Sequence, residues 1–348
     1  MNFHDQGQKS RVPYRSQIDR RLPRFIGRVG PFPFPDKSGE APINLASIKM
    51  HLRWRGRVGE NLTAYLMTLP SFIPFLAFHL FPIFWVVFIS FTNYDGFSPP
   101  TWTGLANYTA LLQDGSWWLA VRNTFIFGLG KLAIELPLAL ILAVLLNQHV
   151  FASTWFRTLL FLPHTVSITV MGIIFVFILQ PYQGALNGIL LSLHLIATPL
   201  DYLGQPLSAM LCLIMVGAWS SVGGAMILFL AGLQTIPSEL LESASLDGAN
   251  AAQKLWYIML PLLGPVLRLI LLLSIVGTLR SFDLVKVLTD GGPYESTEVM
   301  FTYIFRYFFT ASNQVGYGAA LGVTASIIIA LVAFLYFRGI RLAQFLSE

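Results

Sequence analysis

The chain has 348 residues, of which 55% are hydrophobic and 11% are charged, and its mean hydropathy is +0.65. A soluble domain carries about 25% charged residues, so this composition excludes an ordinary soluble enzyme and indicates a membrane protein. The single cysteine excludes a disulfide scaffold. The net charge of +5 does not indicate nucleic-acid binding, because 12 of the 22 Lys and Arg residues lie within the first 60 positions.

Residues 1–60 are predicted to form a basic cytoplasmic arm, because they are polar, rich in Lys and Arg, and interrupted by Pro and Gly. The arm lacks the apolar run and small-residue cleavage site of a secretory signal. Contact with anionic lipid headgroups and contact with another subunit are both open roles for it.

Long apolar runs follow, over residues 61–340, and a short tail of residues 341–348 ends the chain. Runs of about 20 apolar residues are typical of membrane-spanning helices, in which every backbone polar group is satisfied internally. The sequence therefore predicts an all-α, polytopic membrane domain with six spans. They are expected at about 62–90, 121–147, 158–180, 208–232, 263–287 and 316–337.

The distribution of positive charge predicts the orientation of these spans. Lys and Arg concentrate in cytoplasmic segments near span ends, and with a cytoplasmic N-terminus only five of the 22 fall in the spans or outside. Both termini are therefore expected in the cytoplasm. The five exceptions are Arg122, Lys131, Arg280, Lys286 and Arg306.

Span two carries Lys131 and Glu135, four residues apart in an apolar helix, and span five carries Arg280 and Asp283, three apart. Each pair is interpreted either as a self-neutralising link that fixes helix packing or as a functional charge. In the functional reading, Arg280 meets an anionic group on a substrate. The segment around Lys131 lacks the first glycine and the hydroxyl residue of a nucleotide-binding loop, so no nucleotide-binding loop is predicted there.

Spans four and five carry small and polar residues that are candidates for a solute path. Hydroxyl groups can hydrogen-bond to a sugar, a tryptophan can stack on its ring, and glycines leave room. The alternative is ordinary helix packing, in which Gly, Ser and Thr are also common. The candidates are Gly217, Trp219, Ser220, Ser221 and Gly224 in span four, and Ser274, Thr278, Arg280 and Ser281 in span five.

The segment between spans four and five has the signals of a helix–turn–helix. Pro237 should end span four, Ser238 should cap a new helix, and Glu239 and Glu242 should lie in its first turn. Gly248 should end that helix in a left-handed turn, before a second short helix. On these signals alone, a docking element and a plain connecting loop are equally supported.

The motif E-S-A-S-L-D-G-A, followed after nine residues by I-M-L-P, resembles the EAA loop of ABC importer permeases. Only Ser243 departs from the consensus. The resemblance covers about residues 60–340, and this region is similar to the larger permease subunit of the maltose importer, of the MalF and UgpA type. It is also carried by F-P-I at 81–83, S-F-T-N-Y-D at 90–95 and T-D-G-G-P at 289–293.

The resemblance implies a type I ABC importer permease fold in the bacterial cytoplasmic (inner) membrane. It also implies carbohydrate import by alternating access, with a cytoplasmic coupling helix built around Glu242, Ala244, Asp247 and Gly248. The implied partners are two ATPase subunits that bind ATP and Mg²⁺, an extracytoplasmic solute-binding protein and a second permease subunit, which is expected to be a different chain.

Two other classes remain as alternatives. An ion-coupled secondary transporter would use Lys131 and Glu135 as a relay, but it leaves the EAA segment without a purpose. An intramembrane enzyme would need paired catalytic groups, and none occurs at a recognisable spacing.

Overall fold

The computed structural model describes residues 57–148, 153–310 and 314–345. Its contacts divide the chain into two units, Met1–Leu66 and Met67–Glu348. Of the first unit only residues 57–66, in α1, are described, so most of the predicted arm lies outside the described residues. Within the described ranges, the cavities and the apolar side-chain clusters lie in the second unit.

Four helical stretches are long and apolar enough to cross a bilayer, as judged by length and composition. The first, Tyr65–Ile89, is formed by α1 (Arg57–Phe75), a π-helical turn η1 (Leu76–Leu80) and α2 (Phe81–Ile89). The other three are α4 (Gly115–Asn147), α8 (Pro206–Leu233) and Val315–Ile340 of α15 (Val315–Phe345).

Two further spans are pairs of helices with a sharp bend. α5 (Ser153–Thr165) meets α6 (Ile168–Ile178) at 94°, and Ala251–Leu262 meets α12 (Gly264–Leu279) at 71°. With each pair counted as one span, the described residues hold six spans, which confirms the predicted all-α class. Pro265 lies in the first turn of α12 and has no N–H to donate to the preceding turn, so the helix breaks there.

The fifth span differs from the predicted continuous helix over 263–287. α12 ends at Leu279, and Ser281 lies in a turn in which its N–H donates to the Thr278 carbonyl, 3.0 Å away. A separate short helix, α13 (Asp283–Leu288), then packs against α6 instead of extending α12. Ser281 therefore does not continue the helical face of Ser274 and Thr278, which corrects the prediction.

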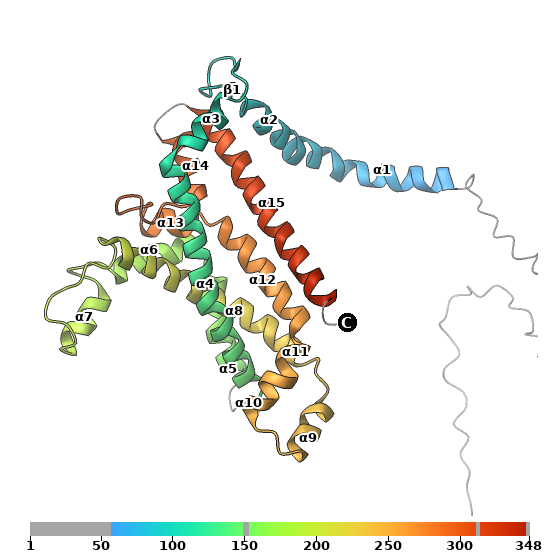
Figure 1. The fold of residues 1–348 in the computed structure, drawn as a ribbon, viewed down its shortest axis with the longest axis vertical. Coiled ribbons are helices and arrows are strands. Elements are labelled where there is room, and N and C mark those ends of the chain that lie inside the picture. Colours follow the sequence, from blue (N-terminus) through green and yellow to red (C-terminus); the bar gives the residue numbers. More distant parts are fainter. Residues whose placement is uncertain (1–56, 149–152, 311–313, 346–348) are drawn as a thin grey trace, which may run out of the picture. The chain divides into compact units, whose positions relative to one another are not determined.

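Short elements connect the spans. Strands β1 (Thr92–Asn93) and β2 (Thr101–Trp102) pair antiparallel and precede α3 (Ala106–Gln113). The spans are also joined by α7 (Ala185–Ser192) and α14 (Met300–Phe309). In Figure 1, β1 and α3 lie at one end of the second unit, and the segment between α8 and α12 lies at the other end.

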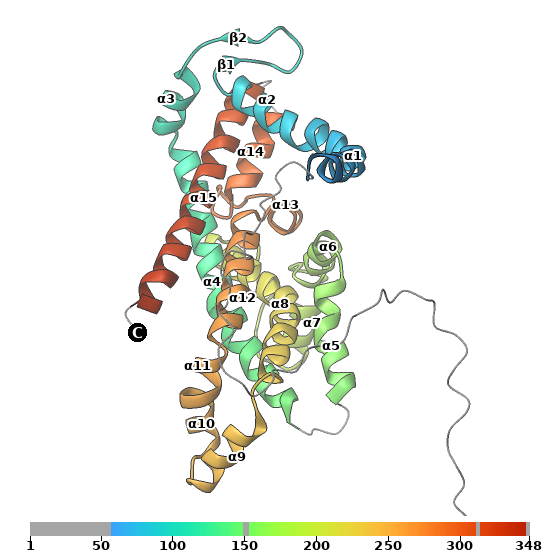
Figure 2. The same cartoon turned by 90° about the vertical axis from the view of Figure 1, so that its right-hand side faces the viewer.

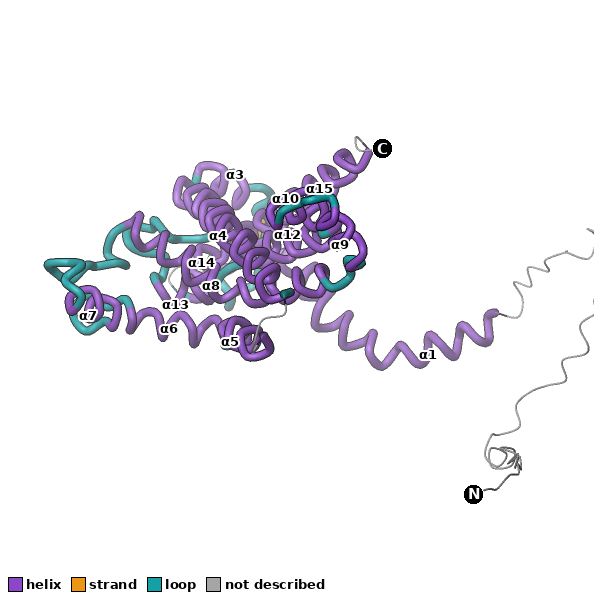
Figure 3. The backbone as a smooth tube through the Cα atoms, turned by 90° about the horizontal axis from the view of Figure 1, so that it is seen from below, coloured by secondary structure: helices purple, strands orange, loops and turns teal. Residues whose placement is uncertain are grey.

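Helix α8 is the centre of the packing. It contacts α4, α5, α6, α12 and α13, and Figure 3 shows these elements as helices seen from one end of the bundle. A Cβ at Gly223 would lie 2.4 Å from the Leu160 carbonyl oxygen, so only glycine lets α8 approach α5 this closely. Two apolar clusters flank the middle of α8, one including Leu213 and Val216 and the other including Met226 and Phe229.

A polar cluster ties the start of α4 to α14 and α15. Asp114 caps α4, and its Oδ2 accepts hydrogen bonds from the hydroxyls of Tyr303 and Tyr317, each at 2.7 Å. Burial alone would raise the pKa of Asp114, but these two bonds and the Trp117 amide outweigh burial and hold the pKa below its ordinary value.

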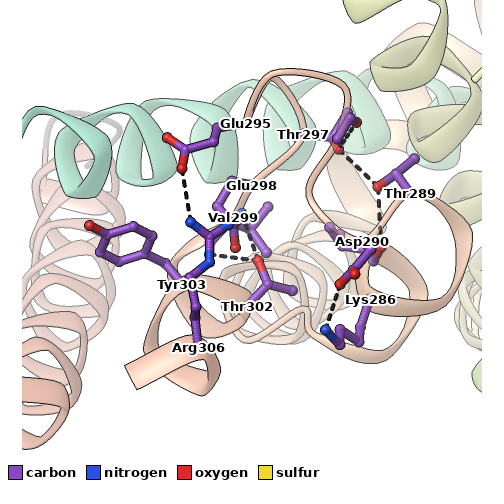
Figure 4. Close-up of polar contacts among 12 residues, drawn as sticks. Lys286, Thr289, Asp290, Glu295, Thr297, Glu298, Val299, Thr302, Tyr303 and Arg306 are labelled. Carbon is purple, nitrogen blue, oxygen red and sulfur yellow. Dashed lines mark hydrogen bonds and ion pairs between the residues drawn. The ribbon is translucent and has the colours of Figure 1, made fainter. Parts of the chain in front are cut away.

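Beside it, the loop between α13 and α14 is fixed by ion pairs. Figure 4 shows Arg306 directed toward Glu295 and Glu298; its Nη1 donates to Glu295 Oε1 at 2.8 Å. The loop is also fastened to α4, because Asn123 donates to the Glu295 carbonyl at 3.0 Å. These contacts fix the loop between α13 and α14 against α4.

We expect Asp114→Asn to lower the stability of the purified protein at neutral pH by about 1.5–3 kcal/mol, because two hydroxyls lose a charged acceptor. The lowered pKa means that the carboxylate stabilises the fold above its unfolded pKa of about 3.9. That stabilisation is lost as pH falls through the lower folded pKa. Thermal unfolding of the wild type and the variant across pH measures this contribution. A stability difference that stays constant at acidic pH would contradict the assignment.

Candidate functional site

Two adjoining cavities lie between α4, α8 and α12 and the turn after α12. The larger, of about 420 Å³, is lined by residues of α4, α5, α8 and α12, including Glu135, Phe161 and His164. The smaller, of about 270 Å³, reaches Arg280 and Asp283. Lys131, Ser221 and Gly277 line both, so the two cavities share a wall.

The cavities adjoin the two apolar clusters that flank the middle of α8. Phe127 and Leu284 of the first cluster line the smaller cavity, and Ala225 and Ile270 of the second line the larger one. Mostly apolar walls with a few convergent polar and charged groups are typical of sites that hold a small solute.

The structure brings most of the predicted solute-path residues to these cavities. Gly224 and Ser274 line the larger one, Gly217, Ser220, Arg280 and Ser281 line the smaller one, and Ser221 lines both. Ser281 reaches the cavity from the turn after α12 and not from the helix itself. Whether these residues bind solute stays a prediction.

Two predicted residues lie elsewhere. Thr278 is buried, and its hydroxyl accepts a hydrogen bond from Lys131 Nζ at 3.3 Å. Trp219 is 48% exposed, and its ring packs edge-on against Phe175 of α6, with ring centroids 5.6 Å apart. Trp219 is not among the residues that line either cavity.

Lys131 and Glu135 form an ion pair with Nζ and Oε2 3.3 Å apart, as one of the two interpretations of the sequence predicted. The pair also joins two spans, because Lys131 donates to Thr278 and Glu135 Oε1 accepts from Ser274 at 2.9 Å. Residues four apart on α4 thus match hydroxyls four apart on α12. We call these four residues the α4–α12 ladder.

The other predicted pair does not form. Among the described residues, Arg280 and Asp283 make no ion pair with each other or with any other group. The reason is local: α12 ends at Leu279 and Asp283 begins α13, so the two side chains are not on one helix. Both still line the smaller cavity.

Phe161, His164 and Gly277 line the larger cavity without having been predicted from the sequence. His164 Nδ1 lies 3.2 Å from the Ser220 carbonyl oxygen, which holds the ring against α8. Its neighbour Pro163 is buried in α5. A histidine next to a proline inside a span was the only feature of the sequence that could have indicated His164 as a cavity residue.

The segment between α8 and α12 forms the predicted helix–turn–helix (Figure 2). α9 (Ser238–Leu246) is followed by Gly248 at a φ of +83°, whose N–H donates to the Ser245 carbonyl at 3.1 Å. Asn250 and Gln253 then form a reciprocal cap that starts α10 (Ala251–Lys254). The chain continues through η2 (Leu255–Met259) and α11 (Leu260–Leu262) into α12.

Two details of this segment differ from the sequence prediction. Ser238 is the first helical residue and not the cap; Pro237 precedes the helix and no side chain caps it. Glu239 is in the first turn, but Glu242 lies one turn later. Proline sets the extended backbone that a cap position requires, so the helix begins one residue earlier than expected.

The surface of this segment is open. Glu242, Asp247 and Gly248 are exposed, Ala244 is partly buried, and neither Glu239 nor Glu242 makes an ion pair within the described part of the chain. A hollow of about 290 Å³ is lined by Asp247, Gly248 and Tyr257 among others.

Six spans around cavities that contain charged and hydroxyl groups, with an exposed helix–turn–helix at one end, are typical of a multi-span membrane subunit of a transport system. A family model described as the binding-protein-dependent transport system inner membrane component matches residues 135–342. This match spans more than half of the chain, so the chain belongs to that family. Members of the family are membrane components of transporters, so the chain is a transport subunit and not an enzyme.

Named relatives resemble the chain over most of their length. The arabinooligosaccharides transport system permease protein AraP of Bacillus subtilis is 34% identical over 284 residues, covering 80% of this chain and 89% of AraP. The multiple sugar-binding transport system permease protein MsmF of Streptococcus mutans is 34% identical over 264 residues, covering 76% and 90%. The sn-glycerol-3-phosphate permease protein UgpA of Agrobacterium fabrum is 31% identical over 277 residues, covering 79% and 94%.

A solved structure has the same fold. A chain of a bacterial ABC transporter involved in the import of the acidic polysaccharide alginate superimposes with a TM-score of 0.72 at 25% identity. The superposition covers 82% of this chain and 97% of that one. The predicted type I ABC importer permease fold is thereby confirmed, and so is a multi-pass protein of the inner membrane.

Proposed function

We propose that the chain is a permease subunit of an ATP-driven importer that moves a sugar or oligosaccharide across the inner membrane by alternating access. The observation that carries this proposal is the presence, on one bundle, of a chamber among the spans with charged and hydroxyl groups in its walls and of an exposed helix–turn–helix. The chamber would hold the solute, and α9 would transmit the movement of ATPase subunits.

The solute class is supported by the relatives. Those named for arabinooligosaccharides, multiple sugars and alginate handle carbohydrates, and those named for glycerol phosphate and alginate handle acidic solutes. The hydroxyls of Ser220, Ser221 and Ser274 at the cavity walls suit a polyhydroxylated solute. We infer a carbohydrate that carries an acidic group.

The partners follow from the architecture of such importers. The chain has one helix–turn–helix of this kind in its described part, whereas an ATPase dimer offers two docking places, so a second and different permease subunit completes the assembly. ATP and Mg²⁺ are bound by the ATPase subunits. A related transporter is described in complex with an alginate-bound periplasmic protein, which supports an extracytoplasmic solute-binding protein as a further partner.

In the coupling helix we assign Glu242 and Asp247 as charges that face the ATPase, and Ala244 and Gly248 as small residues that permit close approach. This assignment places α9, both chain termini, the arm 1–60 and the tail 341–348 in the cytoplasm. It is supported by the exposure of α9 and by the basic composition of the arm, which also suits contact with anionic lipid.

The secondary-transporter alternative loses its original support. Lys131 and Glu135 contact each other and hydroxyls of α12, so their presence in the span does not require an ion relay.

Purification of the tagged chain from its native membrane tests the proposed assembly. We expect it to bring down one different permease chain and two copies of an ATPase, identified by mass spectrometry and native mass. The variant Glu242→Ala should retain the second permease and lose most of the ATPase. A fully transport-competent preparation that contains only this chain would contradict the proposal.

A further inference from the structure

The smaller cavity has an uneven balance of charge. Its charged lining residues are Lys131 and Arg280, which are cationic, and Asp283, which is anionic. Glu135, the partner of Lys131, lines only the larger cavity, where the two charges offset each other. Over the two adjoining cavities the charges balance, with two cations and two carboxylates, but both cations line the smaller cavity and Glu135 does not.

The two cations are available for different reasons. Arg280 follows the end of α12 and forms no ion pair within the described residues. Lys131 has contacts of 3.3 Å to Glu135 and to Thr278, and its ammonium has three N–H donors. One donor remains for a group in the cavities, both of which Lys131 lines.

Lys131 is paired with Glu135 and Arg280 is exposed at the end of α12, so neither is a buried charge without compensation. Ionisable groups that line a cavity in a membrane domain are nevertheless rare and mark solute pathways. Arginine and lysine are also the side chains that bind carboxylate and phosphate most strongly, through charge-assisted hydrogen bonds. Asp283 also lines the smaller cavity, and its carboxylate opposes an anion there, so both cations are needed to bind one.

We propose that the smaller cavity is a subsite for one acidic group of the solute, a carboxylate or a phosphate, bound jointly by Lys131 and Arg280. The proposal rests on the proposed function and adds to it the position of the acidic group and a cation from α4. The neutral hydroxylated part of the solute then occupies the larger cavity, beside Ser274 and Gly224. Glu135 competes with the acidic group for Lys131 and therefore weakens binding at the subsite.

The test uses the complex purified with its partner subunits and without the solute-binding protein, so that the cavities are probed directly. Thermal unfolding is followed with galacturonic acid as the carboxylate probe, glucose 6-phosphate as the phosphate probe and glucose as the neutral probe. We expect at least one acidic probe to raise the unfolding temperature, and glucose to have a smaller effect. The stronger acidic probe identifies the source of the acid.

Three variants are expected to change the binding of the acidic probe in different directions. Arg280→Met and the double variant Lys131→Met with Glu135→Gln should each weaken binding of the acidic probe about tenfold or more, while leaving glucose unchanged. Glu135→Gln alone should strengthen it, because Lys131 keeps its charge and loses its competitor. Arg268→Met is the matched control, since Arg268 lies on α12 but lines neither cavity.

Equal responses to acidic and neutral probes, or equal binding of acid by wild type and Arg280→Met, would overturn the subsite. If ATP-dependent uptake of sugar by the same complex persisted in that case, the proposed function would stand. Loss of the ATP dependence itself would overturn the function and the subsite together.

Discussion

Replacing Gly248 by proline is expected to abolish uptake and release the ATPase, while the chain still inserts into the membrane. Gly248 has a φ of +83°, and its N–H donates to the Ser245 carbonyl. Proline fixes φ near −65° and has no N–H, so the turn between α9 and α10 cannot form. Because that turn joins α9 to α10 and lies outside the spans, the coupling surface would be lost while the spans keep their structure.

Two matched variants separate backbone geometry from side-chain bulk at this position. A Cβ at Gly248 would meet no atom within 4 Å, so space is not limiting. Gly248→Asn should keep most of the uptake, since asparagine tolerates the left-handed region, and Gly248→Ala should lose stability of the turn by about 1–2 kcal/mol. Uptake rate and ATPase retention in membranes measure the series, and normal uptake by Gly248→Pro would refute the coupling assignment.

Replacing Lys131 by methionine is expected to destabilise the membrane domain by about 3–5 kcal/mol. Glu135 is 3% exposed, and Lys131 is its ion-pair partner among the described residues, so the substitution leaves a buried carboxylate without a cation in contact. Glu135→Gln should cost less, because Lys131 keeps Thr278 as a partner and reaches the cavities.

The double variant Lys131→Met with Glu135→Gln should recover most of the loss, since glutamine is neutral and can still accept the hydrogen bond from Ser274. The thermal midpoint of each purified variant supplies the double-mutant cycle. Additive losses in the two single variants would show that the α4–α12 ladder does not act as a unit.

Much of the fold could be predicted because few backbone structures can span a lipid bilayer. Six apolar runs had to become helices, and Gly248 indicated the turn between two short helices, as observed. The fifth span was the exception. Pro265 and the polar residues after Leu279 break it in two places, and α13 packs on α6, an interaction that no local pattern encodes.

The candidate site was only partly predictable for a related reason. Small and hydroxylated residues on spans four and five pointed to the correct helices, and most of them line the cavities. The α4–α12 ladder joins residues 139 and 147 positions apart in the chain, so its second half could not be read from span two alone. Trp219, also a candidate for the solute path, packs against Phe175 of α6, and periodicity does not show which face of α8 meets α6.

Solute uptake into proteoliposomes that contain the purified complex and its solute-binding protein tests the central claim most directly. The account predicts uptake that requires ATP on the side of the membrane where the ATPase subunits lie. Uptake should stop with a hydrolysis-deficient ATPase subunit, and it should continue when a protonophore removes the proton gradient. Uptake that proceeds without ATP and collapses with the protonophore would contradict it.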